Sequence, residues 1–138
     1  MICSETKLIV RYAETDKMGI VHHSNYLVWF EAGRTDFVKK LGMSYSDIES
    51  MGIMLPLIEL NCKFYGSATY EDEITVITSI KDITYTRIYF NYEILKKGCP
   101  KPIVTGETVH VWTNTGLKPV NLKKYKPEIY NLLAGIKA

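Results

Sequence analysis

A short segment ahead of a predicted helix gathers most of the side chains that could take part in chemistry: Asp16, Gly19, His22, His23, Asn25 and Tyr26. The first amides of a helix lack intrahelical partners and together carry roughly half a positive charge. They can therefore polarise a carbonyl group or hold an oxyanion. A carboxylate nearby can attack that carbonyl or activate a water molecule. The segment is the candidate active site.

Asp16 and Gly19 also have a purely structural interpretation. An Asp followed three residues later by Gly is typical of a turn, in which the Asp side chain caps backbone amides and the Gly supplies a positive φ. The spacing by itself does not separate a capping carboxylate from a catalytic one. Both interpretations stay open at the level of residue types.

The adjacent histidines His22 and His23 do not indicate a metal site. Neighbours at a helix start point in different directions, and His110 lies in a strand-like segment far along the chain. Such a histidine is more often a hydrogen-bonded structural residue. We therefore expect neither a metal nor another cofactor.

Composition and charge predict an ordinary globular protein. The 138 residues, 46% hydrophobic and 23% charged, fit one domain spanning residues 1–138. The net charge of +2 is too small for a nucleic-acid footprint, and the apolar runs are too short to span a membrane. The charged amino terminus does not match a signal peptide, and the three cysteines are widely spaced without a CxxC pair. A cytoplasmic location is expected.

One long helix is predicted directly after the candidate site. From Ser24 to Gly42, apolar residues recur with helical spacing at Leu27, Phe30, Phe37, Val38 and Leu41. Ser24 or Asn25 is the expected N-cap, because these side chains accept hydrogen bonds from first-turn amides. Gly42 is expected to end the helix, after two lysines that suit its negative C-terminal end.

Strands precede and follow this helix. Residues 7–11 predict a first strand, and further strands are predicted at residues 54–65, 73–82, 86–96 and 103–113. Short helical turns are expected at residues 44–50 and 127–133. This order predicts the α+β class, with a five-stranded antiparallel sheet wrapped around one long helix. Such a sheet leaves exposed edges, so a homo-oligomer, either a dimer or a tetramer, is expected.

The sequence resembles a known family over most of its length. The stretches RYAETDKMGIVHHSNYLVWFEAGRTDF, KFYGSATYEDEITVITSI and NTGLKPVNL are similar to motifs of the hot-dog-fold acyl-CoA thioesterases of the 4-hydroxybenzoyl-CoA and YbgC-like type. The resemblance implies the hot-dog fold and hydrolysis of an acyl-CoA or acyl-carrier-protein thioester. It also implies a site shared between subunits, with residues 61–67 and the strand carrying Arg87 as candidates for the partner's contribution.

The resemblance also implies residue roles. Asp16 takes the place of the family's catalytic Asp, and the backbone N–H of His23 takes the helix-start position that polarises the thioester carbonyl. The substrate-binding positions fall on Gly19, Val21, Asn25, Tyr26 and Glu31. The sequence departs from the family pattern at Glu14, His22, Gly33 and Asn114.

Alternatives remain at the level of function and of single residues. A dehydratase on the same fold would place a catalytic His in a different motif, and a non-catalytic acyl-thioester sensor would need no attacking group such as Asp16. Glu31 has a second interpretation as a carboxylate that is either solvent-facing or paired with Arg34 or Thr35. The lysines near residue 124 form either a solvated face or a contact to coenzyme A phosphates.

Overall fold

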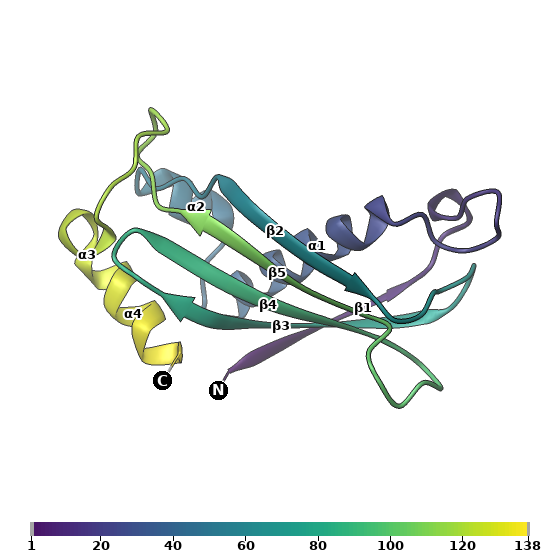
Figure 1. The fold of residues 1–138 in the computed structure, drawn as a ribbon. Coiled ribbons are helices and arrows are strands. Elements are labelled where there is room, and N and C mark those ends of the chain that lie inside the picture. Colours follow the sequence, from purple (N-terminus) through teal and green to yellow (C-terminus); the bar gives the residue numbers. More distant parts are fainter. Residues whose placement is uncertain (1, 138) are drawn as a thin grey trace.

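A five-stranded antiparallel sheet curves around one long helix in the computed structural model, which describes residues 2–137 (Figure 1). The strands are β1 (Cys3–Ile9), β2 (Leu57–Phe64), β3 (Glu73–Ile83), β4 (Arg87–Lys96) and β5 (Val104–Val111), in the spatial order β1-β3-β4-β5-β2. The helices are α1 (Ser24–Lys40), α2 (Tyr45–Ser50), α3 (Leu122–Tyr125) and α4 (Pro127–Lys137), with a 3-10 helix η1 (Tyr12–Glu14). The predicted α+β class and the antiparallel sheet are confirmed.

The core lies between α1 and the inner face of the sheet. Alternate residues of β3 and β4 are buried, as their sequence alternation predicts: Ile74, Val76, Thr78, Ile80, Ile88, Phe90, Tyr92 and Ile94. Helix α1 buries Trp29, Phe30 and Phe37 against them, and Phe30 stacks on Tyr92 with ring centroids 4.3 Å apart. These aromatic contacts fix the height of α1 above the sheet, and with it the position of the helix start.

Gly33 marks the close approach of α1 to β3. A Cβ atom at this position would collide with Thr78 Oγ1 and would meet Val76 Cγ1 at 3.0 Å. The β-branched threonine on the facing strand therefore accounts for a glycine at this position.

Several local predictions were wrong. The first strand is Cys3–Ile9 rather than residues 7–11, because Cys3 already pairs with Ser79 on β3 and the pairing stops at Ile9. Neither Ser24 nor Asn25 is the N-cap of α1, a position that His23 occupies without a side-chain cap. The last helix extends beyond residue 133, and α3 and η1 were not predicted.

The strands predicted at residues 54–65 and 103–113 are shorter in the structure, at Leu57–Phe64 and Val104–Val111, whereas two predicted helix features are confirmed. Gly42 follows the end of α1 with a φ of +86°, which confirms its role in stopping the helix. The short helix at residues 44–50 is confirmed as α2, whose N-cap Ser44 accepts a hydrogen bond from the amide of Asp47 at 3.0 Å.

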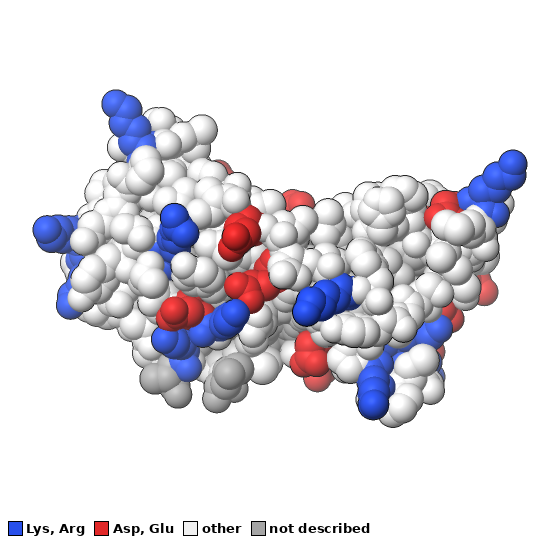
Figure 2. All heavy atoms as spheres, in the orientation of Figure 1, with Lys and Arg blue, Asp and Glu red and all other residues white. Residues whose placement is uncertain are grey.

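Strand β2 forms one edge of the sheet and is open on both faces. Large apolar side chains along it are about half exposed, including Leu57 at 51% and Phe64 at 51%. On the face of the molecule drawn in Figure 2, positive and negative side chains are mixed. None of the helices between residues 2 and 137 combines the length and apolar character needed to cross a bilayer.

Candidate active site

The segment between η1 and α1 folds back on itself as a tight loop. Thr15 bridges to Val21 in antiparallel fashion, and the amide of Asp16 donates to the carbonyl of Ile20 at 2.9 Å. Asp16 Oδ1 accepts from the amide of Met18 at 2.8 Å, and Gly19 adopts a φ of +84°. The structural interpretation of the Asp-to-Gly spacing is therefore correct. This turn holds the Asp16 side chain through one oxygen and leaves Oδ2 without a hydrogen-bond partner among residues 2–137.

The start of α1 offers one backbone N–H that donates to no group within residues 2–137. The amide of His22 donates to the Glu14 carbonyl at 2.9 Å, and the amide of Asn25 donates to the His22 carbonyl at 3.0 Å. The His23 N–H has no hydrogen-bond acceptor within residues 2–137. It lies at the positive end of the helix dipole on an exposed residue. Asp16 and His23 do not bond to each other, so both groups remain available to a third molecule.

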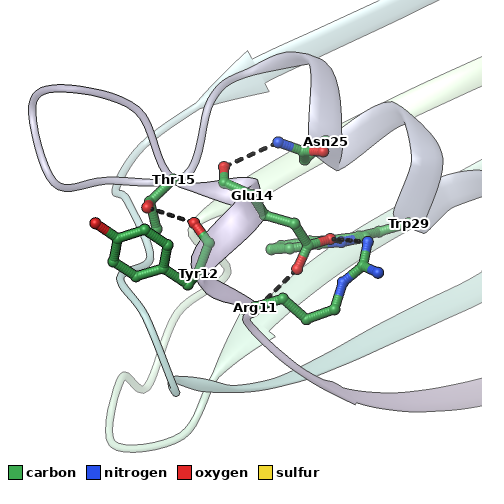
Figure 3. A network of polar contacts seen from close by, with 6 residues as sticks. All are labelled: Arg11, Tyr12, Glu14, Thr15, Asn25 and Trp29. Carbon is green, nitrogen blue, oxygen red and sulfur yellow. Dashed lines mark hydrogen bonds and ion pairs between the residues drawn. The ribbon is translucent and has the colours of Figure 1, made fainter.

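Glu14 connects the loop to the helix start (Figure 3). Its buried carboxylate accepts from the Arg11 amide at 2.8 Å and from Trp29 Nε1 at 2.9 Å, and it pairs with the Arg11 guanidinium at 3.5 Å. Its carbonyl accepts from Asn25 Nδ2 at 2.9 Å. Burial raises the pKa of Glu14, but the hydrogen bonds from Arg11 and Trp29 outweigh it, so the pKa is lowered and the group stays ionised.

Sequence analysis identified Glu14 only as a departure from the family pattern. Its positioning role was missed because Trp29 lies fifteen residues away and the contact depends on the fold. The signal that could have found it is a carboxylate two residues before Asp16, with a tryptophan on the first turns of the following helix.

Three of the predicted substrate-binding residues have clear structural partners. Val21 is buried, and its amide donates to the Ala68 carbonyl at 2.9 Å. Tyr26 is also buried; its hydroxyl accepts from the Ala68 amide at 3.3 Å, and its ring lies 5.7 Å from that of Phe64. The Asn25 side chain is bound to Glu14. These residues tie the loop to the end of β2, while Gly19 shapes the turn; their contacts to substrate stay predictions.

Glu31 is exposed, as the solvent-facing alternative of its structural interpretation predicts. It forms no ion pair with Arg34 within the described chain, and Thr35 donates to its backbone carbonyl at 3.1 Å instead. Glu31 lines a cavity of about 360 Å³, which we call the Arg34 recess. Its other lining residues include Arg34, Tyr45, Glu49, Leu55 and His110.

A chain of polar groups runs beneath the Arg34 recess. Arg34 Nη1 donates to the Tyr92 hydroxyl at 3.0 Å, which lies 2.6 Å from Thr108 Oγ1. Thr108 Oγ1 lies 3.0 Å from His110 Nε2, and His110 Nδ1 lies 3.0 Å from the Leu55 carbonyl. Arginine can only donate and a carbonyl can only accept. A neutral His110 therefore donates from Nδ1 and accepts at Nε2, and each hydroxyl donates towards His110.

Burial keeps both titratable rings of this polar network, His110 and Tyr92, uncharged. It lowers the pKa of His110 from 6.5 to about 4, although the bond to the Leu55 carbonyl acts in the opposite direction. It raises the pKa of Tyr92 to about 12, against the effect of the Arg34 guanidinium. At neutral pH both rings are uncharged. Within residues 2–137, the recess included, no three His, Cys, Asp or Glu side chains gather where they could hold a metal ion.

Comparison with known proteins decides the family. The sequence profile described as "Thioesterase-like superfamily" matches residues 10–130. The chain belongs to the thioesterase-like superfamily. It is 35% identical over 128 residues to the putative acyl-CoA thioesterase YneP of Bacillus subtilis, which covers 93% of each chain. It superposes with a TM-score of 0.92 on the DHNA-CoA thioesterase from Staphylococcus aureus, at 36% identity, covering 99% of this chain and 92% of that one.

The thioesterase-like chain is also similar to a plant protein of related activity. It is 29% identical to the chloroplastic acyl-acyl carrier protein thioesterase ATL3 of Arabidopsis thaliana, across 86% of this chain and 62% of that protein. The family, the hot-dog fold and the thioester-hydrolase class predicted from sequence are confirmed. The profile match includes the Asp16 loop, α1 and the Arg34 recess.

Proposed function

We propose that the chain hydrolyses an acyl-CoA or acyl-carrier-protein thioester at the junction of the Asp16 loop and α1. The thioester carbonyl oxygen accepts a hydrogen bond from the free His23 N–H. This hydrogen bond strengthens as negative charge develops on that oxygen in the tetrahedral intermediate. The observation that carries the proposal is the His23 amide, which has no acceptor within the described chain and follows the turn that holds the Asp16 carboxylate.

Asp16 has two chemically consistent roles. As a general base, its carboxylate takes a proton from water while the water oxygen attacks the carbonyl carbon, and the proton then passes to the departing thiolate. As a nucleophile, Asp16 forms an anhydride with the acyl group and releases the thiolate, and water then cleaves the anhydride. Both routes yield the free acid and the thiol without a metal or a redox cofactor.

The resemblance to named relatives supports thioesters of both coenzyme A and acyl-carrier protein. The Bacillus protein is named for the first and the Arabidopsis protein for the second. Coenzyme A is the simpler carrier to test. The cytoplasmic location and a direct role for Gly19, Val21, Asn25, Tyr26 and Glu31 in substrate binding stay predictions.

Pairing of two chains along β2 is part of the same proposal. This edge strand exposes apolar side chains on both faces, a feature that usually requires cover from another chain. The predicted partner segment 61–67 begins on β2, which supports its contribution to a shared site. Strand β4, which carries Arg87, lies inside the sheet between β3 and β5, so it cannot provide edge pairing.

Thiol release from a panel of acyl-CoAs tests the proposal, with Asp16→Asn as the decisive variant. Asparagine caps the same kind of turn, so the bond from the Met18 amide is kept while the charged group is lost. We expect kcat to fall roughly a hundredfold or more with little change in folding.

Glu5→Gln, which removes an exposed carboxylate from β1, is the matched control and should retain full activity. Near-normal hydrolysis by a folded Asp16→Asn protein would exclude Asp16 from the chemistry. Saturable acyl-CoA binding without any thiol release by the unaltered protein would favour the sensor alternative instead.

A further inference from the structure

Glu14 lies at the centre of a hydrogen-bond network that joins the Asp16 loop to the first turns of α1 (Figure 3). The residue is only 5% exposed, and a different donor reaches each of its carboxylate oxygens. Oε1 accepts from the Arg11 amide, and Oε2 accepts from Trp29 Nε1. Trp29 is 3% exposed, so without this acceptor its indole N–H would lose a partner in a place that water does not reach. The bond therefore holds the Glu14 side chain against α1.

The backbone carbonyl of Glu14 bonds to the chain on both sides of His23. It accepts from the His22 amide at 2.9 Å and from Asn25 Nδ2 at 2.9 Å. These donors come from one residue before His23 and two residues after it. The His23 N–H between them has no acceptor within residues 2–137. The direction in which this N–H points therefore depends on where the Glu14 carbonyl lies.

A carboxylate is the group that suits both donors. An amide of the same shape has one oxygen and one NH₂ group, so its NH₂ would face either the Arg11 amide or the Trp29 indole N–H. The Arg11 guanidinium, 3.5 Å from Glu14 Oε2, also partly offsets the carboxylate charge. Without this offset, a buried negative charge near the helix start would oppose the charge that develops on the thioester oxygen.

We propose that Glu14 is a positioning residue for thioester hydrolysis, which sets the direction of the His23 N–H. Trp29 and Arg11 hold the Glu14 carboxylate, and the Glu14 carbonyl in turn holds the helix start. Glu14 touches no substrate and acts through the His23 amide alone. This inference rests on the proposed function.

Glu14→Gln tests the role of the carboxylate with little change in side-chain shape. We expect kcat to fall roughly tenfold to a hundredfold while KM changes by less than about twofold, because small displacements of a group that stabilises the transition state have effects of this size. Trp29→Phe removes the same hydrogen bond from the other side and should give a similar loss. Glu73→Gln, which alters an exposed carboxylate paired with Lys97, is the matched control and should retain full kcat.

A double-variant cycle with His23→Pro separates positioning from a general loss of structure. The proline variant lacks the N–H that Glu14 directs, so adding Glu14→Gln should lower kcat by less than about twofold further. If Glu14 acts only by supporting the fold, its full loss appears again in the proline background, and that result overturns the inference. Circular dichroism checks the folding of each variant. Should Glu14→Gln not fold, Trp29→Phe takes its place in the same cycle.

The outcomes separate this inference from the proposed function. Full kcat in folded Glu14→Gln and Trp29→Phe proteins, or a change in KM alone, overturns the inference and leaves the proposed function intact. Thiol release from no acyl-CoA by the unaltered protein overturns both.

Discussion

At the scale of single residues, the site depends on groups whose hydrogen bonds are only partly used. Asp16 is held through one carboxylate oxygen, and the His23 N–H has no acceptor within the described chain. Glu14, by contrast, has both carboxylate oxygens engaged. Fully bonded residues therefore hold the structure, and the partly bonded ones next to them remain free for chemistry.

The backbone angles of His23 permit a selective test of its amide. Its φ of −55° lies within the range of proline, and its N–H has no acceptor to lose within residues 2–137. His23→Pro should therefore fold normally but lower kcat by roughly a hundredfold to a thousandfold, the usual effect of removing an oxyanion donor. His23→Ala keeps the N–H and should retain activity within about threefold.

Circular dichroism and steady-state kinetics on both variants check this prediction. A large loss in His23→Ala with unchanged structure would place the imidazole itself in the mechanism, as a proton carrier.

His110 predicts a loss of stability in mild acid. Its pKa is 6.5 when unfolded and about 4 when folded, so between these values the unfolded chain binds a proton that the folded chain does not. Lowering the pH from 6.5 towards 4 should cost up to about 1.4 kcal/mol of unfolding free energy per pH unit, with no contribution above 6.5.

Urea denaturation of the protein and of His110→Gln at several pH values measures this effect. The variant is expected to be less stable at neutral pH but to lose less stability on acidification. Identical pH dependence of the two proteins would show that another group controls the acid response.

At the scale of elements, the close packing of α1 on β3 brings Gly33 against Thr78, so substitutions at these two positions should be energetically coupled. Gly33→Ala places a methyl group against Thr78 Oγ1, a buried hydroxyl that has no hydrogen-bond partner within the described residues. We expect a loss of roughly 1 to 3 kcal/mol from this overpacking. Adding Thr78→Ala removes the colliding atom and should restore part of the loss, because Val76 remains close.

A thermodynamic cycle over the two single variants and the double variant measures this coupling. Additive effects would mean that α1 moves away from the sheet instead of pressing on Thr78.

The long-range contacts explain which elements could be predicted from sequence. The periodicity of α1, its end at Gly42 and the alternation in β3 and β4 are local patterns, and the structure agrees with them. The N-cap prediction was wrong because both candidate side chains contact other groups: Asn25 Nδ2 donates to the Glu14 carbonyl, and Ser24 Oγ lies 2.8 Å from His22 Nδ1. The contacts of Glu14 and Arg34 were missed because their partners lie far along the chain, since Arg34 meets Tyr92 fifty-eight residues away.

At the scale of the whole molecule, the proposed active site requires two chains. Strand β2 is exposed on both faces, and its Phe64 end contacts Tyr26 on the first turn of α1. Light scattering should therefore report a dimer or a tetramer built from such dimers, and specific activity should fall as dilution produces monomers.

Leu60→Lys on β2 tests the same point, because it places like charges near one another across the proposed two-fold interface. A monomer with full specific activity at the lowest concentration would disprove the shared site.

The anchoring of Glu14 also bears on how substrate enters and product leaves. Opening the loop would draw a buried carboxylate away from Trp29 and from the Arg11 amide and guanidinium, and charge-assisted hydrogen bonds of this kind are among the stronger ones in proteins. The loop that carries Asp16 is therefore expected to stay closed on the timescale of turnover. In the proposed dimer, exchange of thioester for acid and thiol would proceed past a fixed loop, and its rate would not depend on a moving lid.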